Sequence, residues 1–359
     1  MNRIHARTRR HRMLGLALLV ALVVMSTLSL FIGSQGLEWP DFSSTQTQAH
    51  TPTHTPTHTP PSPGAFADAA QAALILDIRL PRTLGVVALG LLLGLGGALA
   101  QGLFRNPLAD PYLLGSGSGA ALAVTLVAAA SAGATAAWQP LEPLVRAGVM
   151  GAAFVGALGG ALLTLLLARG AQHTHRLLLA GLVVGVVLGA LTDLVSTFVP
   201  DAWRQRQSLL LGNTQLLNNA AVAALWAMAL LGLAFSLALA RVLDVLTLGE
   251  EAAASLGLPV APMRLLLVGV MAACTAVAVS QAGLILFVAL VAPHLVRHLA
   301  PSGHGFLLPA SAGMGAVVLL AADIGARWAL APQELPVGVV TGVGGGVYLL
   351  ALLHRRQPR

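Results

Sequence analysis

The chain has 359 residues, of which 56% are hydrophobic and only 9% are charged, and its mean hydropathy is +0.81. A water-soluble domain of this length would carry more charged surface. The net charge is +7, and lysine is absent, so the basic side chains are arginines. A P-loop needs a lysine for the phosphates, so this chain is not itself an ATPase of that class. The arginines lie at the ends of apolar segments rather than in a patch, which argues against nucleic-acid binding.

The apolar residues come in runs of about 20, the length that crosses the hydrocarbon core of a bilayer as a helix. The sequence therefore predicts an all-α, polytopic membrane protein of about ten transmembrane helices. The single cysteine, Cys274, lies in one of these runs, which excludes an intrachain disulfide and favours a packed side chain. The expected spans are 13–32, 83–103, 112–132, 145–168, 177–199, 219–241, 264–282, 284–299, 306–323 and 336–353.

The N-terminal region divides into three parts. Residues 1–12 contain five arginines and precede the apolar run 13–32. A cleaved signal peptide has this order, but the run is long and no A-x-A site follows, which favours a retained helix with a cytoplasmic N-terminus. The next segment, 33–73, alternates Thr, Pro and His in its middle and is expected to be an extended outer loop. Its residues His50, His54 and His58 suggest either a metal-binding tract or a polar linker, and the entropy of ordering mobile ligands favours the linker.

The helical domain is expected over 74–353, followed by the basic tail 354–359. Ten crossings return the C-terminus to the side of the N-terminus, and the basic tail agrees with the positive-inside rule. Arg79, Arg82 and Arg327 then fall on the outer side, against that rule. An acidic partner surface would explain them, and snorkelling of long side chains at the interface is the alternative.

Polar residues near the last two spans suggest a network. Asp323 and Arg327 are four residues apart on one helix face and can form an ion pair. Glu334 stands just before Pro336 at the start of the last span, where the helix dipole favours a carboxylate. A purely structural network of these side chains is one interpretation.

Two proline motifs lie on the inner side. The connector 105–111 contains Asn106 and Pro107 in a rigid turn, across which Arg105 and Asp110 can pair. Pro293 is expected to kink its helix and free a carbonyl. The adjacent His294 has no clustered partner and is better read as a packed or interfacial side chain than as a ligand.

The stretch 241–264 interrupts the apolar pattern with a short polar piece, and 249–256 can form about two turns of helix. Glycines recur at every fourth position in two spans, a spacing that lets helix backbones approach closely. This spacing favours tight bundle packing, and the alternative is that these faces line a path or a dimer seam. These glycines are Gly181, Gly185 and Gly189 in one span and Gly338, Gly342 and Gly346 in the other.

Taken together and in order, these motifs resemble the permease family of ABC importers for iron–siderophore complexes, haem and vitamin B12. The resemblance covers about 70–359. It rests on RLPR (79–82), QGLFRNPLADPYLLG (101–115), LGEEAAASLG (248–257), AGLILFVALVAPHLVRHL (282–299), LLPASAGMGAVVLLAADIGAR (307–327) and ELPVGVVTGVGGGVYLLALL (334–353).

The resemblance implies a type II importer permease fold in the inner membrane of a bacterium, with 33–73 in the periplasm and both termini in the cytoplasm. It implies a second permease copy, most simply a homodimer, two cytoplasmic ATPase subunits that use the ATP, and a periplasmic binding protein. No cofactor, metal or nucleic acid is expected on this chain, and its other partner is membrane lipid. An iron(III)–siderophore is the favoured substrate, with vitamin B12 or haem as alternatives.

The resemblance also assigns roles to residues. Arg79, Arg82 and Arg327 match positions that receive glutamates of the binding protein. The glycine faces of spans 177–199 and 336–353 match helices that contribute to the path. The ATPase-coupling loop is expected to contain Gly249, Glu250, Glu251, Ala254, Leu256 and Gly257. Which of these side chains contact the ATPase stays open: solvated charges are the usual state of such a glutamate pair, whereas Ala254, Leu256 and Gly257 fit the cleft.

Two other classes of protein remain as alternatives. An ion-coupled secondary transporter would need intramembrane carboxylates, for which Asp193 and Asp323 are the candidates. A structural or assembly protein of the membrane would show no coupling to ATP.

Overall fold

The computed structural model describes residues 2–33, 36–37, 74–131, 142–168 and 174–355. The chain folds into an all-α bundle, with a small antiparallel pairing of β1 (Ile32–Gly33) and β2 (Gly36–Leu37). A π-helical turn, η1 (Leu74–Arg79), leads into α3, and a 3-10 turn, η2 (Pro111–Leu114), precedes α4. The helices are α1 (Asn2–Phe31), α3 (Leu80–Leu103), α4 (Ser116–Ser131), α5 (Glu142–Leu167), α6 (Thr174–Phe198), α7 (Pro200–Leu211), α8 (Asn219–Ala238), α9 (Ala240–Leu246), α10 (Glu250–Ser255), α11 (Val260–Ala282), α12 (Val288–Leu299), α13 (His304–Trp328) and α14 (Val337–Arg355).

The predicted polytopic membrane architecture is confirmed. Within the described ranges, seven helices are long and apolar enough to cross a membrane, and α4, α12 and α14 are shorter apolar helices. Each of the ten predicted spans coincides with one of these helices. Helix α7 lies in a stretch predicted to be a loop. Pro200 occupies the first turn of α7, a position that suits proline, but the polar sequence that follows lacks the apolar run on which the span prediction relied.

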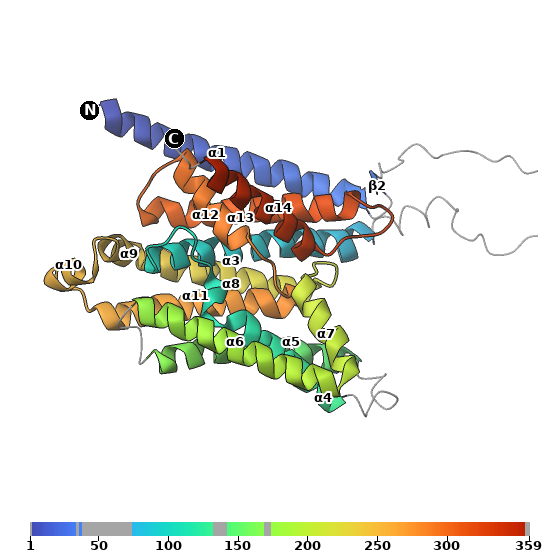
Figure 1. The fold of residues 1–359 in the computed structure, drawn as a ribbon. Coiled ribbons are helices and arrows are strands. Elements are labelled where there is room, and N and C mark those ends of the chain that lie inside the picture. The colour runs from blue at the N-terminus through green and yellow to red at the C-terminus, as the bar shows by residue number, and fades with distance from the viewer. Residues whose placement is uncertain (1, 34–35, 38–73, 132–141, 169–173, 356–359) are drawn as a thin grey trace, which may run out of the picture.

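Helix α3 is the centre of the bundle. In the most apolar part of this helix 89% of the residues are buried. Helices α13, α8, α12 and α11 pack around it (Figure 1). Close approach of α3 and α13 depends on glycine: a Cβ on Gly94 would lie 2.1 Å from the Ser311 carbonyl oxygen, and one on Gly90 2.5 Å from the Ala316 Cα. Helices α4 and α5 pack through Gly119, Gly156 and Gly160 in the same way, and α6 packs against both of them.

Helix α12 shows what its proline does. Pro293 has no N–H to donate to the carbonyl of Ala289 four residues earlier. That carbonyl faces Gly97 of α3, where a Cβ would clash with it. Gln101, one turn further along α3, donates to the neighbouring Leu290 carbonyl at 3.1 Å. The expected freed carbonyl therefore lies against the glycine face of α3.

The two ends of the bundle differ. The start of α1 and the end of α14 lie at the same end as α10, which projects from the bundle, whereas the end of α1, the start of α3 and α7 lie toward the opposite end (Figure 1). This arrangement matches the expectation that both termini and the 249–257 loop share one side. The Thr/Pro/His segment, with His50, His54 and His58, lies outside the described residues.

Candidate functional site: the α9–α10 end and the opposite polar network

The α10 segment is a short helix bounded by glycines with positive φ. Gly249 precedes it at φ +114°, and Gly257 follows Leu256 at φ +80°. The amides of Gly257 and Leu258 donate to the carbonyls of Ala254 and Ala253 at 2.9 and 3.1 Å. This pair of bonds is the Schellman ending of a helix, which glycine favours because it lacks a Cβ. The predicted two turns of helix are therefore present.

The tip of α10 is uncovered in the single chain. Ala253 is fully buried, while Ala254, Leu256 and Gly257 are exposed, with Leu256 at 67%. A Cβ at Gly257 would meet no heavy atom within 4 Å. This projecting tip is therefore available to a partner surface.

The two glutamates of α10 behave differently. Glu251 is exposed, as expected, but Glu250 receives a hydrogen bond from Arg264 of α11 at 2.8 Å. Arg105, after α3, lies 3.8 Å from the same carboxylate oxygen. Because the Arg264 side chain is only 3% exposed, Glu250 is an anchor of α10 rather than a solvated charge. The prediction that both glutamates are solvated is wrong for Glu250.

The expected pairing of Arg105 with Asp110 is also not formed. Asp110 instead accepts a hydrogen bond from the Tyr112 amide at 2.8 Å and begins η2. Burial raises the pKa of the Asp110 carboxyl to about 6, and the bond from Tyr112 opposes that shift. Asn106 and Pro107 form the predicted tight turn, in which Oδ1 of the Asn106 side chain accepts a hydrogen bond from the Leu108 amide at 2.9 Å.

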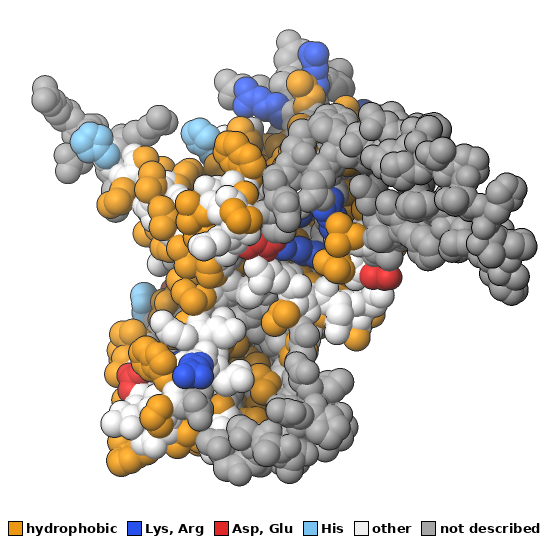
Figure 2. Space-filling view, turned by 90° about the vertical axis from the view of Figure 1, so that its right-hand side faces the viewer, with side chains coloured by type: hydrophobic (Ala, Val, Ile, Leu, Met, Phe, Trp, Pro, Cys, Tyr) orange, Lys and Arg blue, Asp and Glu red, His pale blue; other side chains and the backbone are white. Residues whose placement is uncertain are grey.

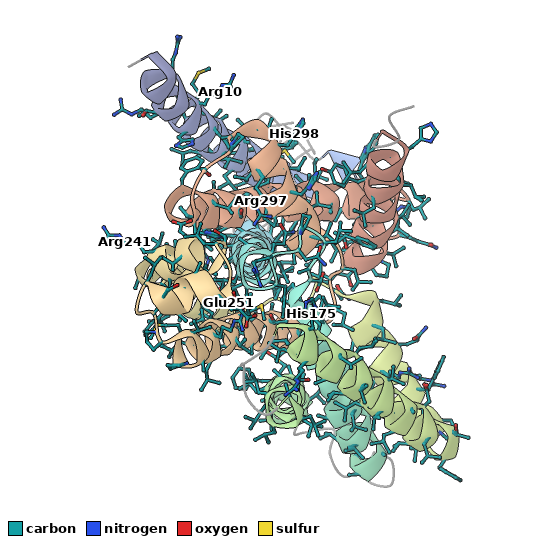
Figure 3. All side chains as sticks on the ribbon, turned by 60° about the vertical axis from the view of Figure 1, so that its left-hand side comes forward. Arg10, His175, Arg241, Glu251, Arg297 and His298 are labelled. Carbon is teal, nitrogen blue, oxygen red and sulfur yellow. The ribbon has the colours of Figure 1, made fainter. Side chains whose placement is uncertain are left out.

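Basic side chains surround this end of the molecule. Figure 3 labels Arg10 of α1, Arg241 of α9 and Arg297 and His298 of α12 at the same end as Glu251. His294, one turn before His298, makes an edge contact with Tyr348 of α14 at a centroid distance of 5.8 Å. His294 therefore lies among packed side chains.

The opposite end holds a polar network centred on Asp323, which is fully buried near the end of α13. Arg82 of α3 contacts Asp323 at 3.0 Å and Glu334, before α14, at 2.8 Å. Arg327 contacts the second Asp323 oxygen at 2.8 Å. Thr214, between α7 and α8, donates to Asp323 at 2.5 Å. In the space-filling view of this end, acidic and basic side chains meet near the middle of the visible face (Figure 2).

Arg327 also holds the end of α1. Its guanidinium donates to the carbonyls of Ser29 and Ile32 at 2.9 and 2.8 Å, and to the Ser29 hydroxyl. The last carbonyls of a helix have no partner within the helix, and a cation there also suits the dipole. Pro336 follows the network at the start of α14, and the predicted structural network of Asp323, Arg327 and Glu334 is present.

These contacts bear on the predicted docking arginines. Arg82 is 8% exposed and Arg327 2%, and both are paired with carboxylates of the same chain. Intrachain acids thus account for these two arginines without a partner. Arg79 is half-buried and donates to the Leu30 carbonyl at 3.1 Å. Docking through the three arginines stays a prediction, and the geometry places Arg79 nearest the surface.

The two glycine series divide by position. Gly181 and Gly338 are buried, and a Cβ there would lie 2.0 Å from the Leu113 carbonyl oxygen and 2.3 Å from that of Leu211. Tight packing explains this pair. Gly189, Gly342 and Gly346 are half-buried, with no heavy atom within 4 Å of a Cβ position. Their faces are therefore available for a path or a second copy.

The candidate proton carriers are both paired. Asp193 lies 2.5 Å from Arg206 of α7, and Asp323 is held by two arginines. Among the described side chains, no group of three or more His, Cys, Asp and Glu residues could hold a metal ion. Cys274 is buried, in line with a packing role.

Comparison with solved structures defines the class. The fold matches a chain of a metal-chelate type ABC transporter in an inward-facing conformation, with a TM-score of 0.79 and 26% identity over 96% of this chain and 99% of that chain. A chain of PsaBC from Streptococcus pneumoniae in complex with Fab shares the fold alone, with a TM-score of 0.53 and 16% identity. The architecture is that of a type II ABC importer permease.

The sequence comparisons then give the family. Residues 20–355 match the FecCD transport family, and the chain belongs to that family. It is 40% identical over 288 residues to the hemin transport system permease protein HmuU of Yersinia pestis, covering 79% of this chain and 83% of the relative. It is 37% identical over 342 residues to the cobalamin import system permease protein BtuC of Halobacterium salinarum, covering 94% and 85%.

Proposed function

We propose that this chain is the membrane permease subunit of a binding-protein-dependent ABC importer for a metal chelate. It works in the inner membrane as two copies with two ATPase subunits and a periplasmic binding protein. The observation that carries the proposal is the exposed apolar tip of α10, at the end of the molecule where α1 begins and α14 ends. A separate chain hydrolyses the ATP, so the permease needs no cofactor of its own.

The orientation follows from charge. The end with α10 also carries Arg10, Arg241 and Arg297, which the positive-inside rule assigns to the cytoplasm. The ATPases then dock on Ala254, Leu256 and Gly257. Closure of the ATPases would displace α10, and α6 and α14 would respond by opening the path on one side and closing it on the other.

The substrate is proposed to be a bulky metal chelate that passes without tight coordination. The half-buried faces at Gly189, Gly342 and Gly346 offer small side chains rather than ligands. The family resemblance alone makes an iron(III)–siderophore the first candidate. Relatives named for hemin and for cobalamin make these two chelates the alternatives to compare.

Uptake into proteoliposomes tests the proposal. Vesicles would contain the permease with its ATPase, with the binding protein outside, ATP inside and a radiolabelled ferric siderophore, hemin or cyanocobalamin as the probe. We expect ATP-dependent uptake of one chelate that requires the binding protein. Uptake by the permease alone on a proton or sodium gradient would contradict the proposal and support a secondary transporter.

The α10 assignment has its own variant. Gly257→Arg places a long cation on the exposed tip at a φ that favours glycine, and should abolish uptake and binding-protein-stimulated ATP hydrolysis without preventing membrane insertion. Leu299→Arg is the control, because Leu299 is 51% exposed at the end of α12. Normal uptake by Gly257→Arg would remove α10 from the mechanism.

A further inference from the structure

We infer that Asp244 and His304 form a positioning link that fixes the α9–α10 segment to α13 and α3 and so transmits its movement to the bundle. This inference rests on the proposed function, because it concerns the segment on which the ATPase would dock. Asp244 lies on α9, six residues before Glu250, and His304 is the first residue of α13.

One carboxylate oxygen makes both contacts of the link. Oδ1 of Asp244 accepts from the backbone amide of His304 at 3.0 Å and lies 2.7 Å from the His304 ring nitrogen Nδ1. The first bond satisfies one of the free amides at the start of α13. The second adds a contact that only the side chain of His304 can supply.

The glycines on either side leave room for this contact. A Cβ on Gly303 would lie 3.3 Å from Asp244 Oδ2, so a larger residue there would crowd the carboxylate. A Cβ on Gly102 of α3 would lie 2.7 Å from His304 Nε2. The imidazole is therefore held between α9 on one side and α3 on the other.

The burial of the two partners differs in a way that favours a mechanical role. The His304 side chain is 7% exposed, whereas that of Asp244 is 48% exposed. In the described part of the chain, Nε2 of His304 is buried without a hydrogen-bond partner. A ring whose one polar contact is Asp244 loses that contact if α9 moves away, so α9 and α13 are expected to move together.

The link complements the second anchor of the segment. Glu250 ties α10 to Arg264 of α11 and approaches Arg105. Asp244 ties α9 to α13, so the segment has one side-chain anchor on each side of its turn. A force applied at the α10 tip is thereby shared between α11 and α13, the latter being the main partner of α3.

Side-chain variants at His304 separate this role from simple capping of α13, because none of them removes the backbone amide. His304→Asn keeps an N–H donor close to the position of Nδ1, and His304→Leu removes it. Both are measured in the complete transporter, with copurification of the ATPase as the check on folding and assembly. The readout is the increase in ATP hydrolysis on addition of the binding protein.

We expect His304→Leu to copurify with the ATPase. The increase in ATP hydrolysis on addition of the binding protein should be about five- to tenfold smaller than in wild type, a typical size for coupling between sites. His304→Asn should retain most of it. Equal stimulation in wild type and His304→Leu would overturn the inference, as would equal loss in both variants, since the donor would then not matter.

A measurement on the permease alone keeps the inference distinct from the proposed function. Amide hydrogen exchange over 240–255 should be faster in His304→Leu than in wild type and close to wild type in His304→Asn. If the wild-type permease assembles with no ATPase, the proposed function fails while this exchange still reports the link. Unchanged exchange in His304→Leu would overturn the link itself.

Discussion

Asp323 is a buried carboxylate shared by two arginines from different helices. Arg82 brings α3 to it, Arg327 brings the end of α1, and Thr214 adds a hydroxyl from the α7–α8 connection. A buried ion pair adds little compared with apolar packing, but loss of one partner leaves an uncompensated charge. The arrangement therefore fixes where these helix ends lie more than it raises stability.

Arg327→Ala should destabilise the protein by about 3–5 kcal/mol, because Asp323 loses a charge partner and the end of α1 loses its donor. Thermal unfolding in detergent measures the loss. Arg79→Ala is the matched control, since Arg79 is half-buried on the same side of the bundle and donates to the Leu30 carbonyl. Equal stability of the two variants would show that the network is not structural. The double variant Arg327→Met with Asp323→Asn should recover part of the loss.

The glutamate pair of α10 gives a second contrast between neighbours. Glu250→Gln should weaken the attachment of α10 to α11, since the neutral amide replaces a charge-assisted bond to Arg264 with a weaker one. Glu251→Gln changes only an exposed side chain. We expect ATP hydrolysis stimulated by the binding protein to fall several-fold in the first variant and to stay near wild type in the second. The reverse order would indicate that Glu251 contacts the ATPase directly.

At the level of helices, glycine decides which elements touch. The contact of α3 with α13 brings backbone to backbone at Gly90, Gly94 and Gly315. In lipid, burial of apolar surface drives helix association weakly, so close packing and polar contacts carry much of it. The central position of α3 is thus a property of its glycines.

Gly94→Ala tests this packing. A methyl group there would lie 2.1 Å from the Ser311 carbonyl oxygen, so α3 and α13 must separate, at a cost of about 1–3 kcal/mol. Gly269→Ala on α11 is the control, because that position is open and alanine favours a helix by about 0.8–1 kcal/mol. The first substitution should lower the thermal unfolding temperature, and the second should leave it unchanged or raise it. An unchanged unfolding temperature in Gly94→Ala would mean that α3 and α13 separate without a cost in stability.

For the whole molecule, the positions of α10 and α7 at opposite ends predict an orientation in the membrane, with α10 on the cytoplasmic side, which cysteine labelling can check. In a Cys274→Ala background, cysteine at Ser255 of α10 should be protected from a membrane-impermeant thiol reagent added to intact spheroplasts. Cysteine at Gln205 of α7 should react, because α7 lies toward the opposite end (Figure 1). Both should react after permeabilisation. Reaction at Ser255 in intact spheroplasts would invert the topology and with it the proposed face for the ATPase.

Local sequence predicted the spans because a run of about 20 apolar residues is itself the signal. Contacts between residues far apart in the chain were harder to predict from the sequence. Glu250 and Glu251 look alike in sequence, and only the position of Arg264, 14 residues on, separates them. Arg82 and Asp323 are 241 residues apart, and their pairing depends on the packing of α3 against α13. The acids that pair with Arg82 and Arg327 therefore did not show in the local sequence, and docking of the three outer arginines to a partner stays a prediction.

The cap that Arg327 places on α1 has a consequence for biosynthesis. Ser29 and Arg327 are 298 residues apart, so at about 5–20 residues per second the first helix is made roughly 15–60 s before its cap. In the most apolar part of α1 only 11% of the residues are buried, and the helix packs mainly against α13. During synthesis it stands in the bilayer as a nearly free helix. The bundle closes only when nearly all of the chain has been inserted, which makes its first span one of the last to find its place.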